Sequence, residues 1–509
     1  MEQSFIFGYG DQPVSLTLSQ LNRHGLIAGA TGTGKTMSLK VIAELLSQAG
    51  IPVFLSDVKG DLASLAQTGD TEGLAERLQA THYQDFENQS FPIEIFDALG
   101  VDGVPLRTTV SEMGPLLIAK LLGLNETQTS ILNVVFSIAD EQGLLLIDLT
   151  DLRALLNYVG EHAKELKDSY GTISTASIGV ILRSIVVLEQ EGGHAFFGEP
   201  SFEIQDLMQQ DESGKGIINI LNATKLYQTP TLYATVLLAL LGELYEELPE
   251  VGDLDQPKLV FFFDEAHVLF EDSPKVLVDK IELIVRLIRS KGVGVFFVTQ
   301  NPLDIPDKVS SQLGNRIQHG LRAYTPKELK VVKAVSETFR QSEDRPIDLA
   351  KTIQELATGC AVVSTLDSAG VPSVAQEVMI YPPMSKRGLI DPQVKLKVIN
   401  RSNLLTKYLE PVDRESAHEQ LEQAMAATQA EMIDQADQAQ AEVAIEPDSD
   451  ANRRIKELEA ALAKEVKKKQ PTSRRSDSNL DRFTKNLMSQ VGREIGRTIT
   501  RSITGMFKK

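Results

Sequence analysis

The segment from Gly29 to Thr36, GATGTGKT, constrains the fold of this chain more than any other stretch. It fits the phosphate-binding pattern of glycine, four residues, glycine, lysine and then serine or threonine. An apolar run at residues 25–28 leads into it, and apolar residues at helical spacing follow from Met37 to Gln48. The pattern predicts a strand, a phosphate loop and a helix; the simpler alternative is a glycine turn before a core helix. The predicted loop consists of Gly29, Ala30, Thr31, Gly32, Thr33, Gly34, Lys35 and Thr36.

The residue types of this loop suit a nucleoside triphosphate. Glycines let backbone N–H groups surround a phosphate, and the helix that follows turns its positive end toward the same anion. We expect Lys35 to reach the β- and γ-phosphates and Thr36 to hold Mg²⁺ through its hydroxyl. ATP and Mg²⁺ are therefore the predicted ligands.

A second signal comes much later in the chain, in the run Lys258–Phe270, KLVFFFDEAHVLF. Its apolar start is typical of a buried strand, and Asp264 and Glu265 follow where that strand would end. After a phosphate loop, such a pair predicts the other half of a nucleotide site, with Asp264 holding Mg²⁺ through its water shell and Glu265 polarising the attacking water. A capping pair before a helix is the simpler alternative. His267 is expected to be a structural neighbour rather than a base.

Two other predicted strands also end in polar residues. Gly292–Gln300 follows a predicted helix at residues 274–289, and we expect Gln300 to hydrogen-bond the γ-phosphate and the attacking water, unless it simply ends the strand. Residues 51–57 predict a further buried strand. After it, either Asp57 or Asp61 approaches the nucleotide and metal, or both belong to a polar turn that caps the next helix. The residues alone leave both interpretations open.

The composition excludes several classes of protein. The 509 residues include one cysteine, Cys360, so no internal disulfide can form, and we expect Cys360 to be a small core residue. The amino terminus lacks the features of a secretory signal, and the longest apolar runs are too short to span a bilayer, which predicts a cytoplasmic protein. Because the net charge is −19, any contact with DNA must come from local basic surface.

The spacing of apolar residues also predicts how the chain is divided. Helical spacing dominates between the two halves of the predicted site, which indicates a helical insertion in a strand-rich core. The helices expected there are Pro115–Leu122, Gln128–Ala139, Asp151–Tyr158 and Ile178–Glu189. Further strands are expected at Phe91–Phe96, Gly214–Leu221 and Arg316–Tyr324, with a hairpin from Cys360 to Ile380. The predicted segments are 1–105 and 214–385 for the core, 106–213 for the insertion, 386–410 for an extension of the core, 411–479 for an acidic and then basic linker, and 480–509 for a basic helix.

The charge of the carboxyl-terminal tail changes sign along its length. Residues 410–450 are rich in Asp, Glu, Gln and Ala, which predicts a solvated helix or a disordered segment. From residue 452 onward Lys and Arg outnumber the acids, and Leu480–Phe507 has apolar residues at helical spacing. Such a helix suits an acidic protein, an anionic membrane surface or DNA, or it docks on its own chain.

Taken together, five motifs resemble the HerA–FtsK division of P-loop motor ATPases, and most closely a HerA-like bacterial family. They are GATGTGKT, SDVKGDL, FFFDEAHVLF, LIRSKGVGVFFVTQ and LGNRIQHGLRAY, and the similarity covers about residues 1–400. The resemblance implies an α/β fold with a RecA-like core, whose mostly parallel sheet is of the additional-strand, catalytic-glutamate type. It also implies that Lys35 and Thr36 hold nucleotide and Mg²⁺, that Asp264 and Glu265 are metal holder and catalytic base, and that Gln300 senses the γ-phosphate.

The same resemblance implies an arginine finger supplied by a neighbouring subunit, and hence a homo-oligomeric, hexameric ring. Arg289 fits the place just before the sensor strand best, Arg286 is second, and Arg316 and Arg322 are further candidates. The chain departs from DNA-translocating members because no separate β-barrel precedes the loop and because the tail is not part of a motor core. Two functions therefore remain open: a helicase-like motor on double-stranded DNA, or a protein-remodelling or switch ATPase whose basic helix recruits a protein or membrane.

Overall fold

The computed structural model describes residues 3–252, 254–271, 275–342 and 347–443. The chain divides into two compact units, Met1–Arg414 and Glu415–Lys509. In the second unit the described residues form one long helix, α16 (Ala417–Val443), where the sequence predicted a solvated helix or disorder. The predicted basic helix at Leu480–Phe507 lies outside the described residues. Within the described ranges, no helix combines the length and the apolar character needed to cross a bilayer.

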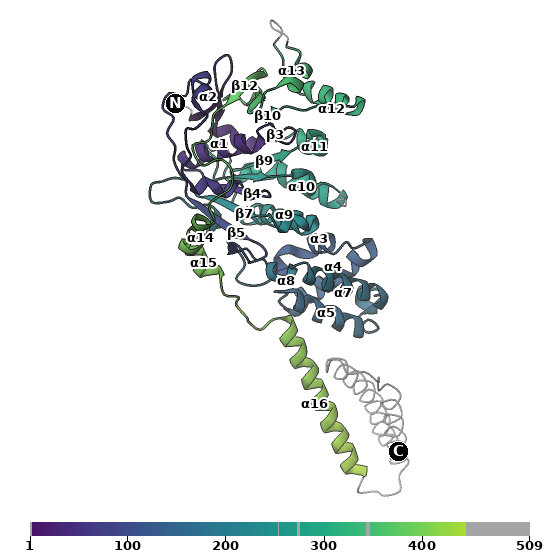
Figure 1. Ribbon diagram of the computed structural model, residues 1–509. Helices are drawn as coiled ribbons and strands as arrows, with labels where there is room; N and C mark the ends of the chain where they lie inside the picture. The colour runs from purple at the N-terminus through teal and green to yellow at the C-terminus, as the bar shows by residue number, and fades with distance from the viewer. Residues whose placement is uncertain (1–2, 253, 272–274, 343–346, 444–509) are drawn as a thin grey trace. The chain divides into compact units, whose positions relative to one another are not determined.

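The first unit is built on a twelve-stranded sheet, ordered β2-β1-β12-β11-β10-β3-β9-β8-β4-β7-β5-β6 (Figure 1). From β10 to β6 all neighbouring strands are parallel, and from β2 to β10 they are antiparallel. The predicted α/β class with a mostly parallel sheet is thus confirmed. The strands are β1 Ser4–Tyr9, β2 Pro13–Thr17, β3 Gly25–Ala28, β4 Val53–Asp57, β5 Ile93–Asp97, β6 Val104–Pro105, β7 Ile218–Asn222, β8 Leu259–Phe263, β9 Val293–Thr299, β10 Asn315–His319, β11 Cys360–Ser364 and β12 Gln376–Ile380.

The order of the central strands determines where the functional residues meet. β9 lies between β3, which leads into the phosphate loop, and β8, which ends at the acidic pair. On its other side β8 pairs with β4. Because these four strands are parallel, their carboxyl ends lie at one edge of the sheet, where ligands bind in open α/β folds. Segments far apart in the sequence therefore meet at this edge.

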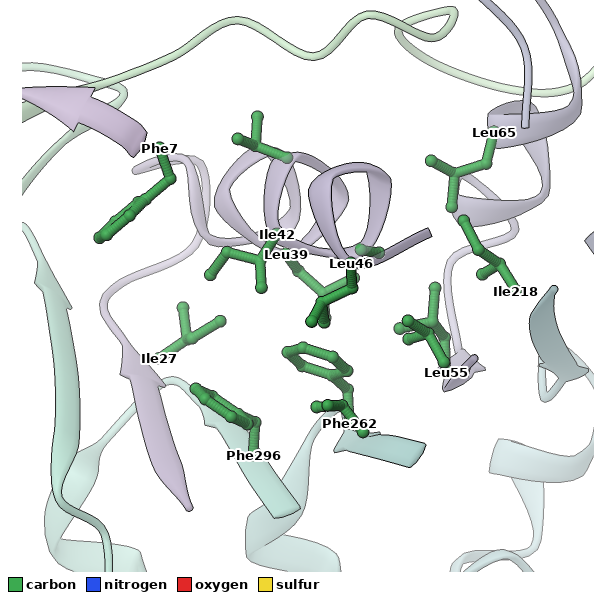
Figure 2. Close-up of a cluster of buried hydrophobic side chains, with 14 of the residues drawn as sticks. Phe7, Ile27, Leu39, Ile42, Leu46, Leu55, Leu65, Ile218, Phe262 and Phe296 are labelled. Atoms are coloured by element: carbon green, nitrogen blue, oxygen red, sulfur yellow. The ribbon is translucent and has the colours of Figure 1, made fainter. Parts of the chain in front are cut away.

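Helices cover both faces of the parallel strands. On one face α1 (Lys35–Gln48) packs Leu39, Ile42 and Leu46 onto the strands (Figure 2). The strand residues that meet it include Ile27, Leu55, Phe262 and Phe296. On the other face lie α9 (Pro230–Glu247) and α10 (Lys275–Leu287) (Figure 1). Burying one such Leu or Phe stabilises the fold by roughly 2 kcal/mol, so this core holds the phosphate loop and the acidic pair on a rigid support.

The stretch between β6 and β7 is mainly helical. Capping boxes at Thr109, Asn125 and Asp148 start three of its helices, so these begin earlier than apolar spacing alone predicts. The first also contains a kink at Gly114, whose φ is 72°, and apolar spacing predicted its start only after this kink. The helices of this stretch are α3 Val110–Leu121, α4 Glu126–Gln142, α5 Leu149–Glu161, α6 Lys167–Tyr170, α7 Thr175–Gln190 and α8 Gly193–Phe196.

Two features at the antiparallel end of the sheet differ from expectation. The amino-terminal residues form the hairpin of β1 and β2, which was not predicted from the sequence, and β1 pairs with β12. β10 stops at His319, five residues before the predicted end, because the chain turns away to meet the phosphate loop. The remaining helices are α2 Ala75–Ala80, α11 Asp307–Ser310, α12 Pro326–Ser336, α13 Leu349–Glu355, α14 Pro392–Arg401 and α15 Asn403–Tyr408.

Candidate nucleotide site

The predicted phosphate loop has the backbone shape that an anion cradle needs. Gly29, Gly32 and Gly34 have φ values of 152°, 77° and 117°, a region that favours glycine. A Cβ atom on Gly29 would lie 2.5 Å from Cβ of His319, so no other residue fits there. Gly34 is the N-cap of α1, and the positive end of this helix faces the loop.

Lys35 is folded onto its own loop. Its ammonium group donates hydrogen bonds to the carbonyl oxygens of Gly29, at 2.6 Å, and Ala30, at 3.2 Å. Burial, followed by the positive charge of Lys59, lowers the pKa of Lys35. A negatively charged phosphate beside Lys35 would offset both effects and favour the charged form. Thr36 follows Lys35 in the first turn of α1 and is half-buried.

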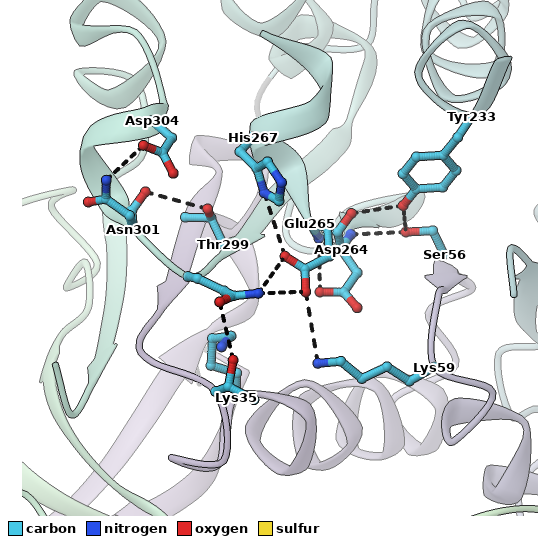
Figure 3. Close-up of polar contacts among 12 residues, drawn as sticks. Lys35, Ser56, Lys59, Tyr233, Asp264, Glu265, His267, Thr299, Asn301 and Asp304 are labelled. Carbon is cyan, nitrogen blue, oxygen red and sulfur yellow. Dashed lines mark hydrogen bonds and ion pairs between the residues drawn. The ribbon is translucent and has the colours of Figure 1, made fainter. Parts of the chain in front are cut away.

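The backbone of Asp264 is fixed by a buried network. Its N–H donates to the hydroxyl of Ser56 on β4, at 2.9 Å, and its carbonyl accepts from the hydroxyl of Tyr233 on α9, at 2.8 Å (Figure 3). Tyr233 also bonds Ser56 at 2.9 Å. Burial, and then the charge of Glu265, raises the pKa of the Asp264 carboxyl to about 7. Two acidic groups are therefore held close together at a cost in free energy.

Glu265 is the most constrained residue of the site. Its backbone has φ 49° and ψ 48°, a left-handed conformation that is unfavourable for a residue with a Cβ atom and that typically marks functional sites. The side chain is buried and accepts hydrogen bonds from Gln300 at 3.2 and 3.3 Å. Lys59 lies 3.9 Å from one carboxylate oxygen and His267 3.5 Å from the other (Figure 3).

Gln300 connects the two halves of the site. Its amide nitrogen donates to Glu265, and its amide oxygen accepts from the hydroxyl of Thr31 in the phosphate loop at 3.2 Å. The residue follows the carboxyl end of β9, between the strands that carry the other two groups. The structure thus brings together the phosphate loop, Glu265 and Gln300, as the sequence predicted for one nucleotide site.

The residues at this edge also fit a divalent cation. Mg²⁺ prefers oxygen ligands, and the carboxylate of Asp264 and the hydroxyl of Thr36 are of that kind. One oxygen of Asp264 accepts from the N–H of Glu265 at 2.9 Å. The raised pKa of Asp264 reflects burial and repulsion from the neighbouring carboxylate, both of which a bound cation would offset.

The structure decides between the two interpretations of Asp57. Its carboxylate accepts from the backbone N–H groups of Gly60, Leu62 and Ala63, at 2.7, 3.0 and 3.2 Å. The side chain is therefore part of a turn that precedes the short 3-10 helix η2 (Leu62–Ala66). The polar-turn interpretation is confirmed for Asp57. The residue that does reach the site from this turn is Lys59, for which the sequence pattern predicted no role.

The candidate finger arginines lie in different places of this chain. Arg289, in η6 (Ile288–Lys291), precedes β9, whereas Gln300 follows it, so a seven-residue strand separates them by about 20 Å. Arg286 is exposed on α10. The guanidinium of Arg316 donates to the carbonyls of Ser310 and Leu313, and that of Arg322 to those of Gln354 and Leu356. Arg316 and Arg322 are thus engaged with their own backbone.

A family model described as helicase HerA-like C-terminal matches residues 3–509. The chain belongs to this HerA-like family. Among curated proteins it is similar to the DNA double-strand break repair helicase HerA of Sulfolobus acidocaldarius, with 24% identity over 372 residues. That match covers 69% of this chain and 64% of the archaeal protein, so the HerA-like chain spans less than two thirds of that relative's length.

Solved structures similar to this HerA-like chain include TrwB and VirB4. The plasmid coupling protein TrwB in complex with ADP and Mg²⁺ is 14% identical, with 76% of this chain and 94% of that chain covered and a TM-score of 0.49. VirB4 of Thermoanaerobacter pseudethanolicus is 13% identical, with 77% and 98% covered and a TM-score of 0.48.

Family membership confirms the resemblance that the motifs predicted. The HerA-like chain carries its predicted phosphate loop on a mostly parallel α/β sheet. Sequence reasoning named Lys35, Asp264, Glu265 and Gln300 because their motifs are local. It did not find that Tyr233 and Ser56 hold the backbone of Asp264, since only the fold brings α9, β4 and β8 together.

Proposed function

We propose that this HerA-like ATPase hydrolyses ATP with Mg²⁺ as a ring-forming motor on double-stranded DNA. The observation that carries the hydrolytic part is the position of Glu265. Its carboxylate is buried, strained and joined through Gln300 to Thr31 of the phosphate loop. A carboxylate joined in this way to the phosphate loop fits the role of a base that accepts a proton from the attacking water.

The other residues of the site have separate roles in this proposal. The N–H groups of residues 29–36 and the ammonium of Lys35 hold the phosphates and neutralise their charge. Gln300 orients the water and the γ-phosphate relative to Glu265. Thr36 and Asp264 would hold Mg²⁺, which when bound supplies positive charge at the phosphate oxygens.

The ring and the DNA substrate are supported by family membership and by the similarity to an archaeal DNA repair helicase. A motor ring would take an arginine from the neighbouring subunit, which would supply positive charge as the γ-phosphate leaves. Arg289 remains the first candidate and Arg286 the second, because both precede the sensor strand β9, where the family resemblance expects the finger. Arg289→Ala subunits mixed with Glu265→Gln subunits should recover part of the activity.

Two substitutions test the hydrolytic site. Lys35→Ala should abolish nucleotide binding or turnover, whereas Glu265→Gln should bind ATP and lower turnover at least a hundredfold, since it removes the base and keeps the shape. Glu337→Gln, at an exposed position, is the matched control. Turnover at the wild-type rate in Glu265→Gln would show that the base has been assigned wrongly.

A second function rests on the charge of the chain. A net charge of −19 opposes generic binding to DNA, which favours a protein-remodelling or switch ATPase that recruits a protein or an anionic membrane through its tail. ATPase rates of the full chain with duplex DNA, single strands or anionic liposomes separate the two. Stimulation by duplex DNA that falls with added salt supports the motor. Rates that are indifferent to DNA and depend on liposomes or protein partners support the second function.

A further inference from the structure

Lys59 projects from a turn that is rigidly built. The turn follows β4, which pairs with β8 in parallel register, Leu55 opposite Phe262, so the chain after β4 lies beside the chain after β8. The carboxylate of Asp57 accepts three backbone N–H groups of this turn, and Gly60 has a φ of 77°. The backbone on both sides of Lys59 is therefore fixed at the edge of the nucleotide site.

The ammonium group of Lys59 forms an ion pair that is unequal in burial. Its side chain is 43% exposed, whereas that of Glu265 is 6% exposed, and Nζ lies 3.9 Å from Oε1. Figure 3 shows Lys59 and His267 on opposite sides of the Glu265 carboxylate. The Lys59 end of the pair is thus open to solvent, while its charge acts on a carboxylate that is shielded from water.

The other groups around Glu265 do not replace this charge. Gln300 is neutral, and Asp264 carries the same sign as Glu265. Lys35 influences the same region, but its ammonium is bound to the carbonyls of its own loop. The hydroxyls of Tyr227 and Tyr233 lie near enough to feel the charge of Glu265, and each is uncharged at neutral pH. In the described part of the chain, Glu265 forms ion pairs with Lys59 and His267.

We propose that Lys59 is a positioning residue for hydrolysis, which holds one carboxylate oxygen of Glu265 so that the carboxylate stays aimed at the attacking water. The inference rests on the proposed role of Glu265 as base. Because the Lys59 end of this ion pair is open to solvent, the pair contributes little to stability, so the effect of Lys59 should be seen in turnover and not in folding. Small displacements of a catalytic group are costly to the rate even when the fold is intact.

The first experiment separates turnover from binding. In Lys59→Met, kcat should fall about tenfold, while the KM for ATP and the affinity for a fluorescent ATP analogue should change less than about threefold. Lys59→Arg should retain most of the activity, because it restores the charge. Lys330→Met, at an exposed lysine of α12, is the matched control and should behave as wild type. A kcat within twofold of wild type in Lys59→Met would overturn the inference.

A double-mutant cycle shows whether Lys59 acts through Glu265. If it does, Lys59→Met in the Glu265→Gln background should cause no further fall in the single-turnover rate. If Lys59→Met lowers the single-turnover rate by the same factor with and without Glu265→Gln, then Lys59 acts on the phosphates or elsewhere. That result would overturn the inference but would leave Glu265 as the proposed base. Turnover at the wild-type rate in Glu265→Gln alone would instead remove the base, and the inference with it.

Discussion

The two edges of the parallel strands use buried polar residues in different ways. At the amino-terminal edge, His24 precedes β3 and is bound on both ring nitrogens by backbone, to the carbonyl of Val285 at 2.7 Å and from the N–H of Val295 at 3.0 Å. At the carboxyl-terminal edge, the carboxylate of Glu265 is held by the side chain of Gln300 and lies near those of Lys59 and His267.

The same contrast holds for the amides. Asn315, at the start of β10, donates to the carbonyls of Gln20 and His24 and accepts from the N–H of Leu366. Gln300, after β9, bonds Thr31 and Glu265 through side chains alone. Backbone partners fix a residue for stability, whereas side-chain partners can rearrange when a ligand enters. In these examples the residues with backbone partners lie at the amino-terminal edge, and those with side-chain partners lie at the candidate nucleotide site.

Substitution of Gln300 is the most direct test of the difference between the two edges. Gln300→Ala should lower turnover about a hundredfold, because it removes the group that orients water and γ-phosphate, and should leave the urea midpoint within the error of wild type. Steady-state ATPase assays and urea denaturation of the same preparations check both. Gln312→Ala, at an exposed glutamine, serves as the control. A loss of stability with unchanged turnover would place Gln300 with the structural residues of the other edge.

The structural role of His24 can be tested by the pH dependence of stability. Burial, and more weakly the charge of Arg289, lowers the pKa of His24 from 6.5 to about 4. Because the N–H of Val295 donates to Nδ1, protonation of that nitrogen would break a buried hydrogen bond. In the window between these two pKa values the unfolded chain binds a proton that the folded chain does not. The contribution of neutral His24 to the stability of the fold is therefore complete above pH 6.5 and is lost as the pH falls toward 4.

Across that pH window, His24 should lower the free energy of unfolding by on the order of 3 kcal/mol. Urea denaturation of wild type and His24→Gln at pH 7 and pH 4.5 measures it, and the variant should lose less stability on acidification. His194→Gln, at an exposed histidine, is the control and should lose as much stability between pH 7 and pH 4.5 as wild type. An equal pH dependence in wild type and His24→Gln would contradict the assignment.

Asn315 tests the structural edge without a change of charge. Asn315→Ala should destabilise the fold by about 2 kcal/mol, because the carbonyls of Gln20 and His24 and the N–H of Leu366 lose a buried partner. The kcat of the folded fraction should stay close to wild type, since no atom of Asn315 reaches the nucleotide site. A large fall in kcat without a shift of the urea midpoint would show that this edge takes part in catalysis.

Local signals explain what the sequence could predict. The strand Gly25–Ala28, the phosphate loop and the start of α1 follow from glycine spacing and apolar periodicity within one short window. Asp264, Glu265 and Gln300 each follow an apolar strand, so the pattern predicted their place at a strand end. The meeting of these ends required parallel strands, which the strand–helix–strand pattern indicated.

What the sequence could not give depends on the order of strands. Lys59 reaches Glu265 because β4 happens to be the neighbour of β8, and no local pattern fixes that neighbour. Tyr233 looks like an ordinary core residue of an apolar helix, yet its hydroxyl bonds Ser56 and the backbone of Asp264. The left-handed backbone of Glu265 is also invisible in the sequence, because a glutamate gives no signal for it.

The left-handed backbone of Glu265 leads to the smallest of the four effects predicted for the two edges. At ordinary positions glycine is less stable than alanine by about 0.5–1 kcal/mol, because it loses more backbone freedom on folding. At φ 49° the order should reverse, since a Cβ atom is strained there. Glu265→Gly should therefore be more stable than Glu265→Ala by about 1 kcal/mol. The two variants lack the carboxylate equally, so their difference in urea midpoint reports the backbone alone, and an alanine variant as stable as the glycine variant would show that Glu265 stores no strain.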